Sequence, residues 1–361
     1  MFPMRVYNFS GGPAMLPLEV LETARAELTD WRSGMSVLEV SHRGRDFVRF
    51  AASVEAALRE VLTVPDNYKV LFLQGGASGQ FDAIPMNLTE PGDSVDFFNT
   101  GQWSKKAIAG SVRQGLTVNV VADEADSKYT TVPAPGSYRI SPTAKYLHYT
   151  PNETIGGVEF DQIPQSEVPL VADCSSTILS QPLDVSRFGV LYGGAQKNMG
   201  VAGLTVVIVR DDLLGRARAT TPEVLNWAAQ AKNDSMLNTP ASFAIYFLSL
   251  VLDWIKANGG LDGMAVRNKA KAEALYGFID QSEFYLNPVA PGARSRMNVP
   301  FVLADPQLDD AFLSGAGQVG LTNLEGHRSV GGMRASLYNA MPMEGVAALI
   351  DYMTRFAAEN G

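Results

Sequence analysis

Four segments of the sequence combine residue types from which an active site could be built. The first, Gln74–Phe81 (QGGASGQF), is a glycine-rich turn between an apolar run and a probable helix over residues 80–88. A helix opening at such a turn presents backbone N–H groups to an anion, here from Ala77 and Ser78, and its dipole favours negative charge. The segment lacks the Gly-Lys-Ser/Thr of a P-loop and is not GxGxxG. Taken alone, it could equally be a turn that merely needs small residues.

The other three segments each contribute one side chain. Asp173 follows the apolar run Leu170–Ala172, so its carboxylate would lie at the carboxyl end of a strand, where α/β sheets bind ligands. Lys197 lies among small residues, which leaves room for a carbonyl cofactor that forms an imine with the amine. Trp103 follows another apolar run and could stack on a flat ring. Singly, each is more often structural: a turn acid, a surface amine or a core aromatic.

Together, the four features predict a site for pyridoxal 5′-phosphate. The turn would bind the phosphate and the aromatic would stack on the ring. The acid would keep the pyridine nitrogen protonated, and the lysine would hold the aldehyde carbon and then carry a proton. Because turn, aromatic, acid and lysine follow successive apolar runs, one edge of a sheet could hold all four.

The elements that must position these residues are short apolar runs alternating with amphipathic stretches. Runs rich in Val, Ile and Phe are typical of strands buried on both faces of a parallel or mixed sheet. They fall at Lys69–Leu73, Ser94–Phe98, Leu116–Val121, Leu170–Ala172, Gly189–Tyr192 and Leu204–Val209. Phe47–Leu62 and Trp103–Arg113 read as helices between them. The pattern predicts an α/β fold with a mostly parallel central sheet and helices on both faces.

The pattern changes after about residue 255. Ala257–Gly260 (ANGG) is a plausible helix stop. Beyond it we expect a long helix, a strand and two further helices, at Gly263–Asp280, Asn298–Leu303, around Leu308–Ala316 and from Met343. The expected organisation is a large α/β domain over residues 16–255 and a smaller α+β domain over residues 256–361, joined by residues 1–15.

Composition excludes several classes of protein. The 361 residues are 46% hydrophobic and 19% charged, which is a globular balance rather than a disordered one. The net charge of -9 provides no global basic field for nucleic acid, so an anionic ligand would need a local cationic cluster. A single cysteine, Cys174, excludes an intramolecular disulfide and a Cys-rich zinc site, and we expect no bound metal.

The same features bear on location. The N-terminus shows no signal-peptide pattern, and the longest apolar stretch, Phe243–Leu252, is too short for a membrane span of ~18 or more residues. With one cysteine, the sequence favours a cytoplasmic protein that does not contact membranes.

The sequence resembles the phosphoserine aminotransferases, fold-type-I pyridoxal-phosphate enzymes of class V. The resemblance covers essentially the whole chain. Its most specific segments are HYTPNETIGGVEF at 148–160, VADCSSTILSQPLDVSRFGVLYGGAQKNMG at 171–200, LNTPASFAIY at 237–246 and GHRSVGGMRASLYNAMP at 326–342. Matches of this length are not credible as chance.

The resemblance implies a role for each matching cofactor residue. Lys197 matches the Schiff-base lysine, Asp173 the acid on the pyridinium nitrogen, and Trp103 the stacking aromatic. Thr154 matches the hydroxyl near the phenolic oxygen of the cofactor. Contacts to the cofactor phosphate are implied for Ala77, Ser78 and Gln196 and, from the other subunit of a homodimer, for Asn238 and Thr239.

The resemblance also implies a substrate site. Arg334 resembles the arginine that clamps the substrate α-carboxylate, a task that suits a planar guanidinium fork. A second cationic set would hold a distal phosphate or the side-chain carboxylate of glutamate. That set is His42, Arg43, His327 and Arg328.

Two positions depart from the family pattern. Some members carry an arginine in the glycine-rich turn, where this chain has Ala77-Ser78, so one possible cation for a substrate phosphate is missing. Gly11 stands where relatives often have Ser or Ala, so any hydroxyl contact from that position is lost.

The implied activity is reversible amino transfer from L-glutamate to 3-phosphohydroxypyruvate, with a further role on a phosphorylated hydroxythreonine in vitamin B6 synthesis. An alanine–glyoxylate or serine–pyruvate type aminotransferase stays open, although the His-Arg pairs favour a phosphorylated substrate. A nicotinamide-dependent dehydrogenase is disfavoured because GxGxxG is missing. A catalytically silent binding protein is disfavoured by the presence of both Asp173 and Lys197.

Overall fold

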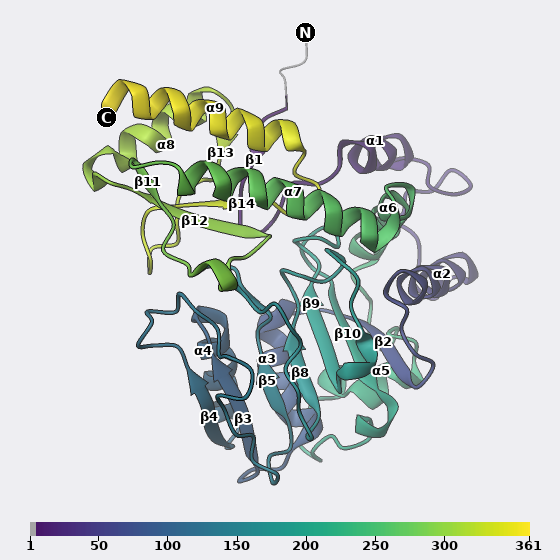
Figure 1. The fold of residues 1–361 in the computed structure, drawn as a ribbon. Coiled ribbons are helices and arrows are strands. Elements are labelled where there is room, and N and C mark those ends of the chain that lie inside the picture. The colour runs from purple at the N-terminus through teal and green to yellow at the C-terminus, as the bar shows by residue number, and fades with distance from the viewer. Residues whose placement is uncertain (1–4) are drawn as a thin grey trace.

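The central feature of the fold is a mixed sheet of seven strands (Figure 1). The computed structural model describes residues 5–361, so residues 1–4 of the N-terminal segment expected to join the smaller domain lie outside the described residues. The strand order is β2-β10-β9-β8-β5-β3-β4. The bounds are β2 Tyr68–Leu73, β3 Ser94–Asn99, β4 Thr117–Asp123, β5 Leu147–Tyr149, β8 Leu170–Asp173, β9 Val190–Gly194 and β10 Thr205–Arg210.

One strand of this sheet runs against the others. β10 pairs antiparallel with both β2 and β9, and the remaining pairs are parallel. The carboxyl ends of all the strands except β10 therefore meet at one edge. The mostly parallel sheet predicted from the apolar runs is confirmed.

The inner strands β8, β9 and β10 are buried along nearly their whole length because helices cover both faces of the sheet. In β2, Val70 and Phe72 belong to a core shared with α1, α2 and α6, whereas Leu71 and Leu73 belong to a core shared with α3, α4 and α5. Alternate side chains of a strand thus enter different cores. The helices are α1 Leu18–Glu27, α2 Arg45–Leu62, α3 Gly76–Leu88, α4 Gln102–Arg113, α5 Trp227–Lys232 and α6 Ser242–Ala257.

A smaller α+β unit lies above the main sheet in Figure 1. Its antiparallel sheet has the order β11-β12-β14. Its elements are α7 Gly260–Asp280, β11 Tyr285–Leu286, β12 Asn298–Leu303, α8 Asp309–Gln318, β14 Met333–Ser336 and α9 Met343–Asn360. A separate hydrophobic cluster joins Phe9 to side chains between Ala272 and Phe356. The domain boundary near residue 255 stays a prediction, and this second core is what such a boundary would require.

The N-terminal segment pairs with the far end of the chain. β1 (Tyr7–Asn8) lies parallel to β13 (Leu321–Thr322), with Tyr7 opposite Leu321.

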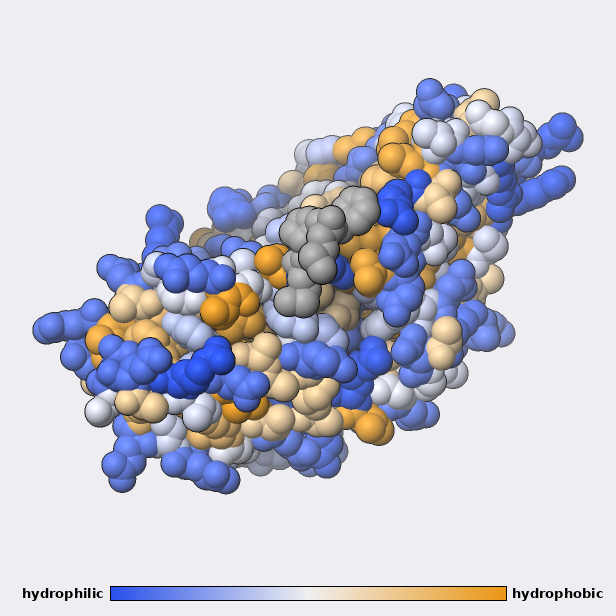
Figure 2. Space-filling view, turned by 90° about the horizontal axis from the view of Figure 1, so that it is seen from above, coloured by the Kyte–Doolittle hydropathy of each residue, from blue (hydrophilic) through white to orange (hydrophobic). Residues whose placement is uncertain are grey.

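The surface of the molecule seen from above is covered mostly by polar and charged side chains, with hydrophobic groups scattered between them (Figure 2). Within residues 5–361, no helix is both long enough and apolar enough to cross a membrane.

Several elements differ from the sequence predictions, and two of them bear on the site. The helix after the glycine-rich turn begins at Gly76 rather than Gln80, so Ala77 and Ser78 lie in its first turn. β5 has only three residues and was not predicted, although it lies between β8 and β3 in the middle of the sheet.

Candidate active site

One cavity lies at the carboxyl edge of the central sheet and gathers the residues predicted to bind a cofactor. Its lining includes Ala77, Ser78, Trp103, Thr154, Asp173, Gln196 and Lys197. The first two belong to the helix after β2, Trp103 to the helix after β3, and Asp173 ends β8. Lys197 lies in the turn between β9 and β10. The expectation that one sheet edge would hold turn, aromatic, acid and lysine is confirmed.

The Lys197 amine is held by neutral hydroxyl groups. Its Nζ donates to Thr154 Oγ1 at 2.6 Å and to Ser176 Oγ at 2.8 Å, and these two hydroxyls are 2.6 Å apart. The side chain is buried, and Nζ lies 5.8 Å from the centroid of the Trp103 ring. Because no carboxylate among residues 5–361 hydrogen-bonds to Nζ, the amine can leave its two partners without breaking a buried ion pair.

Asp173 is a buried carboxylate bonded through only one of its oxygens. Oδ1 accepts from Ser175 N at 3.1 Å and from Ser175 Oγ at 2.6 Å, and Ser175 Oγ accepts from Gly194 N at 3.1 Å. Burial raises the pKa of Asp173, opposed by the Ser175 hydrogen bonds and by the charge of Lys197. A cationic group entering the cavity would favour the ionised carboxylate. The acid is thus placed to bind a protonated ring nitrogen.

The glycine-rich turn directs backbone N–H groups into the cavity. Gly75 and Gly76 have φ of +98° and +63°, the left-handed region that glycine adopts without penalty. α3 starts there with no acidic residue in its first turn, and Ala77 and Ser78 line the cavity. The free N–H groups and the dipole of the helix make this an anion site.

The cavity also contains buried polar atoms without hydrogen-bond partners. These are Trp103 Nε1, Thr150 Oγ1 and Asn152 Oδ1. Buried polar atoms in folded proteins are bonded in about 90% of cases or more, so three exceptions in one cavity indicate a polar ligand. With a lysine, an acid, an indole and a helix N-terminus around the same space, the residues present fit pyridoxal phosphate.

Two predicted phosphate contacts lie away from this cavity. Asn238 Nδ2 donates to Gln74 Oε1 at 3.1 Å, and Gln74 Nε2 donates to the carbonyl of Thr239 at 3.3 Å. Asn238 lines a different cavity, on the other side of the glycine-rich turn. Within one chain, Asn238 and Thr239 therefore do not join the Lys197 site.

The predicted substrate residues fall into two groups. His42 and Arg43 precede α2 and do not line the Lys197 cavity. Arg334 in β14 is largely buried, and its Nε has no hydrogen-bond partner. Desolvation and the charges of Arg328, Arg334 and Lys106 lower the pKa of His327. These last four residues therefore form a local cationic group, with Lys106 Nζ only 4.1 Å from the Trp103 ring centroid.

Comparison with known proteins identifies the family. The model of the class-V aminotransferases matches residues 6–349. The chain belongs to this family. It is 56% identical over 358 residues, 99% of both chains, to a phosphoserine aminotransferase of Hahella chejuensis. Its fold is similar to that of phosphoserine aminotransferase from Bacillus circulans subsp. alkalophilus, with 45% identity, 99% coverage of both chains and a TM-score of 0.96.

A third relative concerns the cofactor. The structure of PLP-bound phosphoserine aminotransferase from Trichomonas vaginalis is 44% identical, with a TM-score of 0.93 over 97% of this chain and 100% of that one. Class-V membership implies pyridoxal phosphate chemistry in this chain as well. The fold class predicted from the sequence is confirmed by these matches.

Three residues of this aminotransferase site escaped the sequence analysis. Lys106 lies three positions after Trp103, a spacing that places both side chains on the same face of a helix. Ser176 lies three residues after Asp173, and no pattern marks it as a partner of Lys197. Glu153 stands inside the quoted PNET segment, directly before Thr154, and its role emerges only from the structure.

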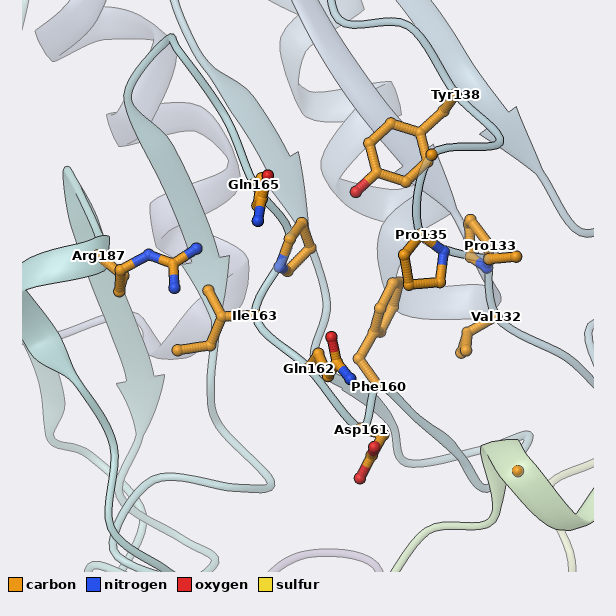
Figure 3. Close-up of a pocket in the computed structure, with 14 residues that line it drawn as sticks. Val132, Pro133, Pro135, Tyr138, Phe160, Asp161, Gln162, Ile163, Gln165 and Arg187 are labelled. Carbon is orange, nitrogen blue, oxygen red and sulfur yellow. The ribbon is translucent and has the colours of Figure 1, made fainter.

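A larger cavity, of ≈ 710 Å³, lies elsewhere on this aminotransferase. It is lined by loop residues 132–136 and 160–165 together with Tyr138 and Arg187, and the close-up shows prolines and aromatic rings around it (Figure 3). It contains no lysine and no helix N-terminal turn. Size alone would thus have selected the wrong cavity for class-V chemistry.

Proposed function

We propose that this class-V aminotransferase transfers the amino group of L-glutamate to 3-phosphohydroxypyruvate, giving O-phospho-L-serine and 2-oxoglutarate. The observation that carries the substrate is the set of three cations, Lys106, Arg328 and Arg334, whose charges act on His327, with Lys106 next to Trp103 of the Lys197 cavity. A doubly anionic phosphate needs such a group in a chain whose net charge is -9. The full-length likeness to phosphoserine aminotransferases supports the same choice.

The proposed cofactor is pyridoxal 5′-phosphate, with its ring between Trp103 and the Lys197 side of the cavity. Its phosphate would accept from the first turn of α3 at Ala77 and Ser78, with Gln196 nearby. Thr154 Oγ1 would face the phenolic oxygen. Bound in this way, the group supplies a carbon that condenses with amines and a ring that withdraws electrons from the substrate Cα.

The residues of the chain then have separate tasks. Asp173 accepts a hydrogen bond from the protonated ring nitrogen and so keeps it cationic. Lys197, released from Thr154 and Ser176, would take the proton from the substrate Cα and deliver it to the carbon that the cofactor's aldehyde group supplies. Arg334 holds the α-carboxylate through a planar fork and orients that proton toward Nζ.

The two substrates share one distal site in this proposal. His327, Arg328 and Lys106 would hold the phosphate of phosphoserine and, in the other half-reaction, the side-chain carboxylate of glutamate. The same cations would admit a phosphorylated hydroxythreonine, the further activity that the resemblance implies. Alanine has no distal anion, so these residues would contribute nothing to its binding.

We further propose that the active unit is a homodimer in which each cofactor site takes residues from both subunits. In their own chain, neither Asn238 nor Thr239 lines the Lys197 cavity: Asn238 lines a different cavity, and the Thr239 carbonyl accepts from Gln74 Nε2. His42 and Arg43 are also outside that cavity. A partner subunit would bring all four toward the phosphate groups. A cytoplasmic location stays a prediction.

The first experiment is a visible absorption spectrum of the purified protein before and after O-phosphoserine. We expect a yellow band from cofactor bound to Lys197, which bleaches on adding phosphoserine or glutamate. Alanine at the same concentration should leave the band unchanged. Bleaching by alanine but not by phosphoserine would keep the cofactor and overturn the proposed substrate. A colourless protein that stays colourless with added pyridoxal phosphate would overturn the proposal as a whole.

A further inference from the structure

Glu153 is a fully buried carboxylate between two residues that line the cofactor cavity, Asn152 and Thr154, and the proposed reaction gives it no task. It lies in β6 (Asn152–Glu153), a short strand paired with β7 (Val158–Glu159). Its side chain is 0% exposed and makes no ion pair with any residue from 5 to 361. A buried charge of this kind is costly unless strong hydrogen bonds hold it, so its partners reveal its role.

The carboxylate caps the helix that carries Trp103. Oε2 accepts from Trp103 N at 2.9 Å and Oε1 accepts from Ser104 N at 2.8 Å. Both donors lie in the first turn of α4, where N–H groups lack partners within the helix and a negative charge is favoured. Burial raises the pKa of Glu153, whereas the two N–H donors and the Ser104 hydroxyl oppose that rise and favour the ionised form.

The sequence leaves space for this cap at Gly101. An ordinary helix is capped by the side chain of the residue before it, but Gly101 has none. A Cβ at Gly101 would lie 2.6 Å from Glu153 Cδ, so any larger residue would displace the carboxylate. The N–H groups at the start of α4 are thus capped by Glu153, about fifty positions away in the sequence, rather than by the residue directly before the helix.

Glu153 therefore connects two groups that would face the cofactor ring. Through its hydrogen bonds it fixes the backbone of Trp103, and through the chain it adjoins Thr154, which binds Lys197 Nζ. We infer that Glu153 is the positioning residue that sets the Trp103 ring and the Thr154 hydroxyl at a fixed separation around the cofactor. This inference rests on pyridoxal phosphate being the cofactor of the proposed function.

The test uses a matched pair of substitutions in the same hairpin. Glu153→Gln keeps the shape of the side chain but places its amide NH₂ against a backbone N–H of α4, so that two donors face each other. Glu159→Gln is the control, because Glu159 is also buried and accepts from a backbone N–H, that of Arg296 at 2.7 Å, but Arg296, with which it also forms an ion pair, does not line the cofactor cavity as Trp103 does. For each full-length variant, the measurements are pyridoxal phosphate affinity, visible circular dichroism of the bound cofactor, and urea unfolding.

We expect Glu153→Gln to weaken cofactor affinity about tenfold or more and to shrink the visible dichroism band. Glu159→Gln should lose stability while keeping wild-type affinity and dichroism. Glu153→Asp keeps the charge and shortens the side chain, so it should restore part of the cofactor affinity and part of the dichroism band. If the Gln variant does not fold, the Asp variant is compared with wild type in its place. Equal affinity losses in the two Gln variants would overturn the inference.

A double-substitution cycle tests the route through Trp103. If Glu153 acts through the indole, the affinity loss from Glu153→Gln should be several-fold smaller in a Trp103→Phe background. An undiminished loss would overturn the positioning role. A wild-type protein that binds no pyridoxal phosphate would instead defeat the proposed function, whereas normal binding by both wild type and Glu153→Gln would defeat only this inference.

Discussion

The guanidinium of Arg334 lies directly against the backbone of Gly11. A Cβ at Gly11 would be 2.5 Å from Arg334 Nη2 and 2.7 Å from Cζ, so the arginine occupies the space that a side chain would fill. Arg334 Nε has no hydrogen-bond partner. The Tyr338 hydroxyl donates to the Gly11 carbonyl at 2.9 Å and so holds the backbone of Gly11 next to the guanidinium. The missing side chain at Gly11 therefore leaves the space that the arginine expected to clamp the substrate occupies.

Gly11→Ala tests this contact. The added methyl group would push the guanidinium away from its place, at a cost of ~1 kcal/mol, or about fivefold in KM for both amino donors. The measurement is steady-state kinetics with glutamate and phosphoserine. Gly277→Ala in α7, where nothing lies within 4 Å of the new methyl, is the matched control and should behave as wild type. An unchanged KM in Gly11→Ala would show that Arg334 adapts freely.

Lys197→Ala removes the amine that would carry the proton. We expect amino transfer to fall by ~10²–10⁴-fold, the usual contribution of a general acid–base group, with little loss of stability. Borohydride followed by mass spectrometry should label wild type at Lys197 and leave the variant unlabelled. Lys269→Ala, whose side chain is 68% exposed on α7, is the control. Retention of the covalent label in Lys197→Ala would place the cofactor on another lysine.

Mixed dimers test the shared site. Lys197→Ala alone and the double variant Asn238→Ala, Thr239→Ala alone should both be nearly inactive. When the two are unfolded and refolded together, hybrid dimers contain one site with Lys197 from one subunit and Asn238 and Thr239 from the other. We expect about a quarter of wild-type activity to return, because random pairing makes half of the dimers hybrids with one intact site each. No recovery would refute the exchange of residues between subunits.

Phosphoserine binding should depend on pH through His327. Burial, followed by the charges of Arg328, Arg334 and Lys106, lowers the pKa of His327 in the free protein, so the ring is largely neutral near pH 7. A bound phosphate favours the protonated ring, and its stabilising effect is present at low pH and lost as pH rises through the pKa of the complex. KM for phosphoserine should rise between about pH 6 and pH 8 more steeply in wild type than in His327→Asn. Identical profiles would exclude His327.

Lys106 should distinguish anionic donors from alanine. Lys106→Ala removes one exposed cation beside Trp103, and we expect KM for phosphoserine to rise by about fivefold, the effect of ~1 kcal/mol. Lys105→Ala is a closely matched control, since Lys105 Nζ lies 3.9 Å from the Tyr129 ring, away from the cavity. An equal rise for both variants would point to a general charge effect.

Sequence patterns located most of the frame that positions this site. The apolar runs of β2, β3, β8 and β9 were visible because both faces of those strands are buried, and the chemistry at their carboxyl ends followed from residue type. β5 was invisible because three residues are too few to show periodicity. The helix start at Gly76 was placed too late, since Ala-Ser-Gly carries no helical apolar spacing.

The partners inside the site could not be derived from the sequence. Glu153 contacts Trp103 and Ser104 across about fifty residues, and local spacing contains no information about such a contact. Ser176 joins Lys197 only because β8 and β9 are neighbours in the sheet. The separation of Asn238 from the cavity is likewise a property of the tertiary fold.

The pairing of Tyr7 with Leu321 has a consequence for how the chain acquires activity during synthesis. Ser10 and Gly11 reach Arg334 only after more than three hundred residues have left the ribosome, because the strand that aligns them is among the last made. The carboxylate clamp proposed for Arg334 can therefore form only near the end of synthesis. A chain that ends at residue 321 would lack that arginine and also α9, whose Leu349 and Phe356 belong to the hydrophobic cluster that contains Phe9.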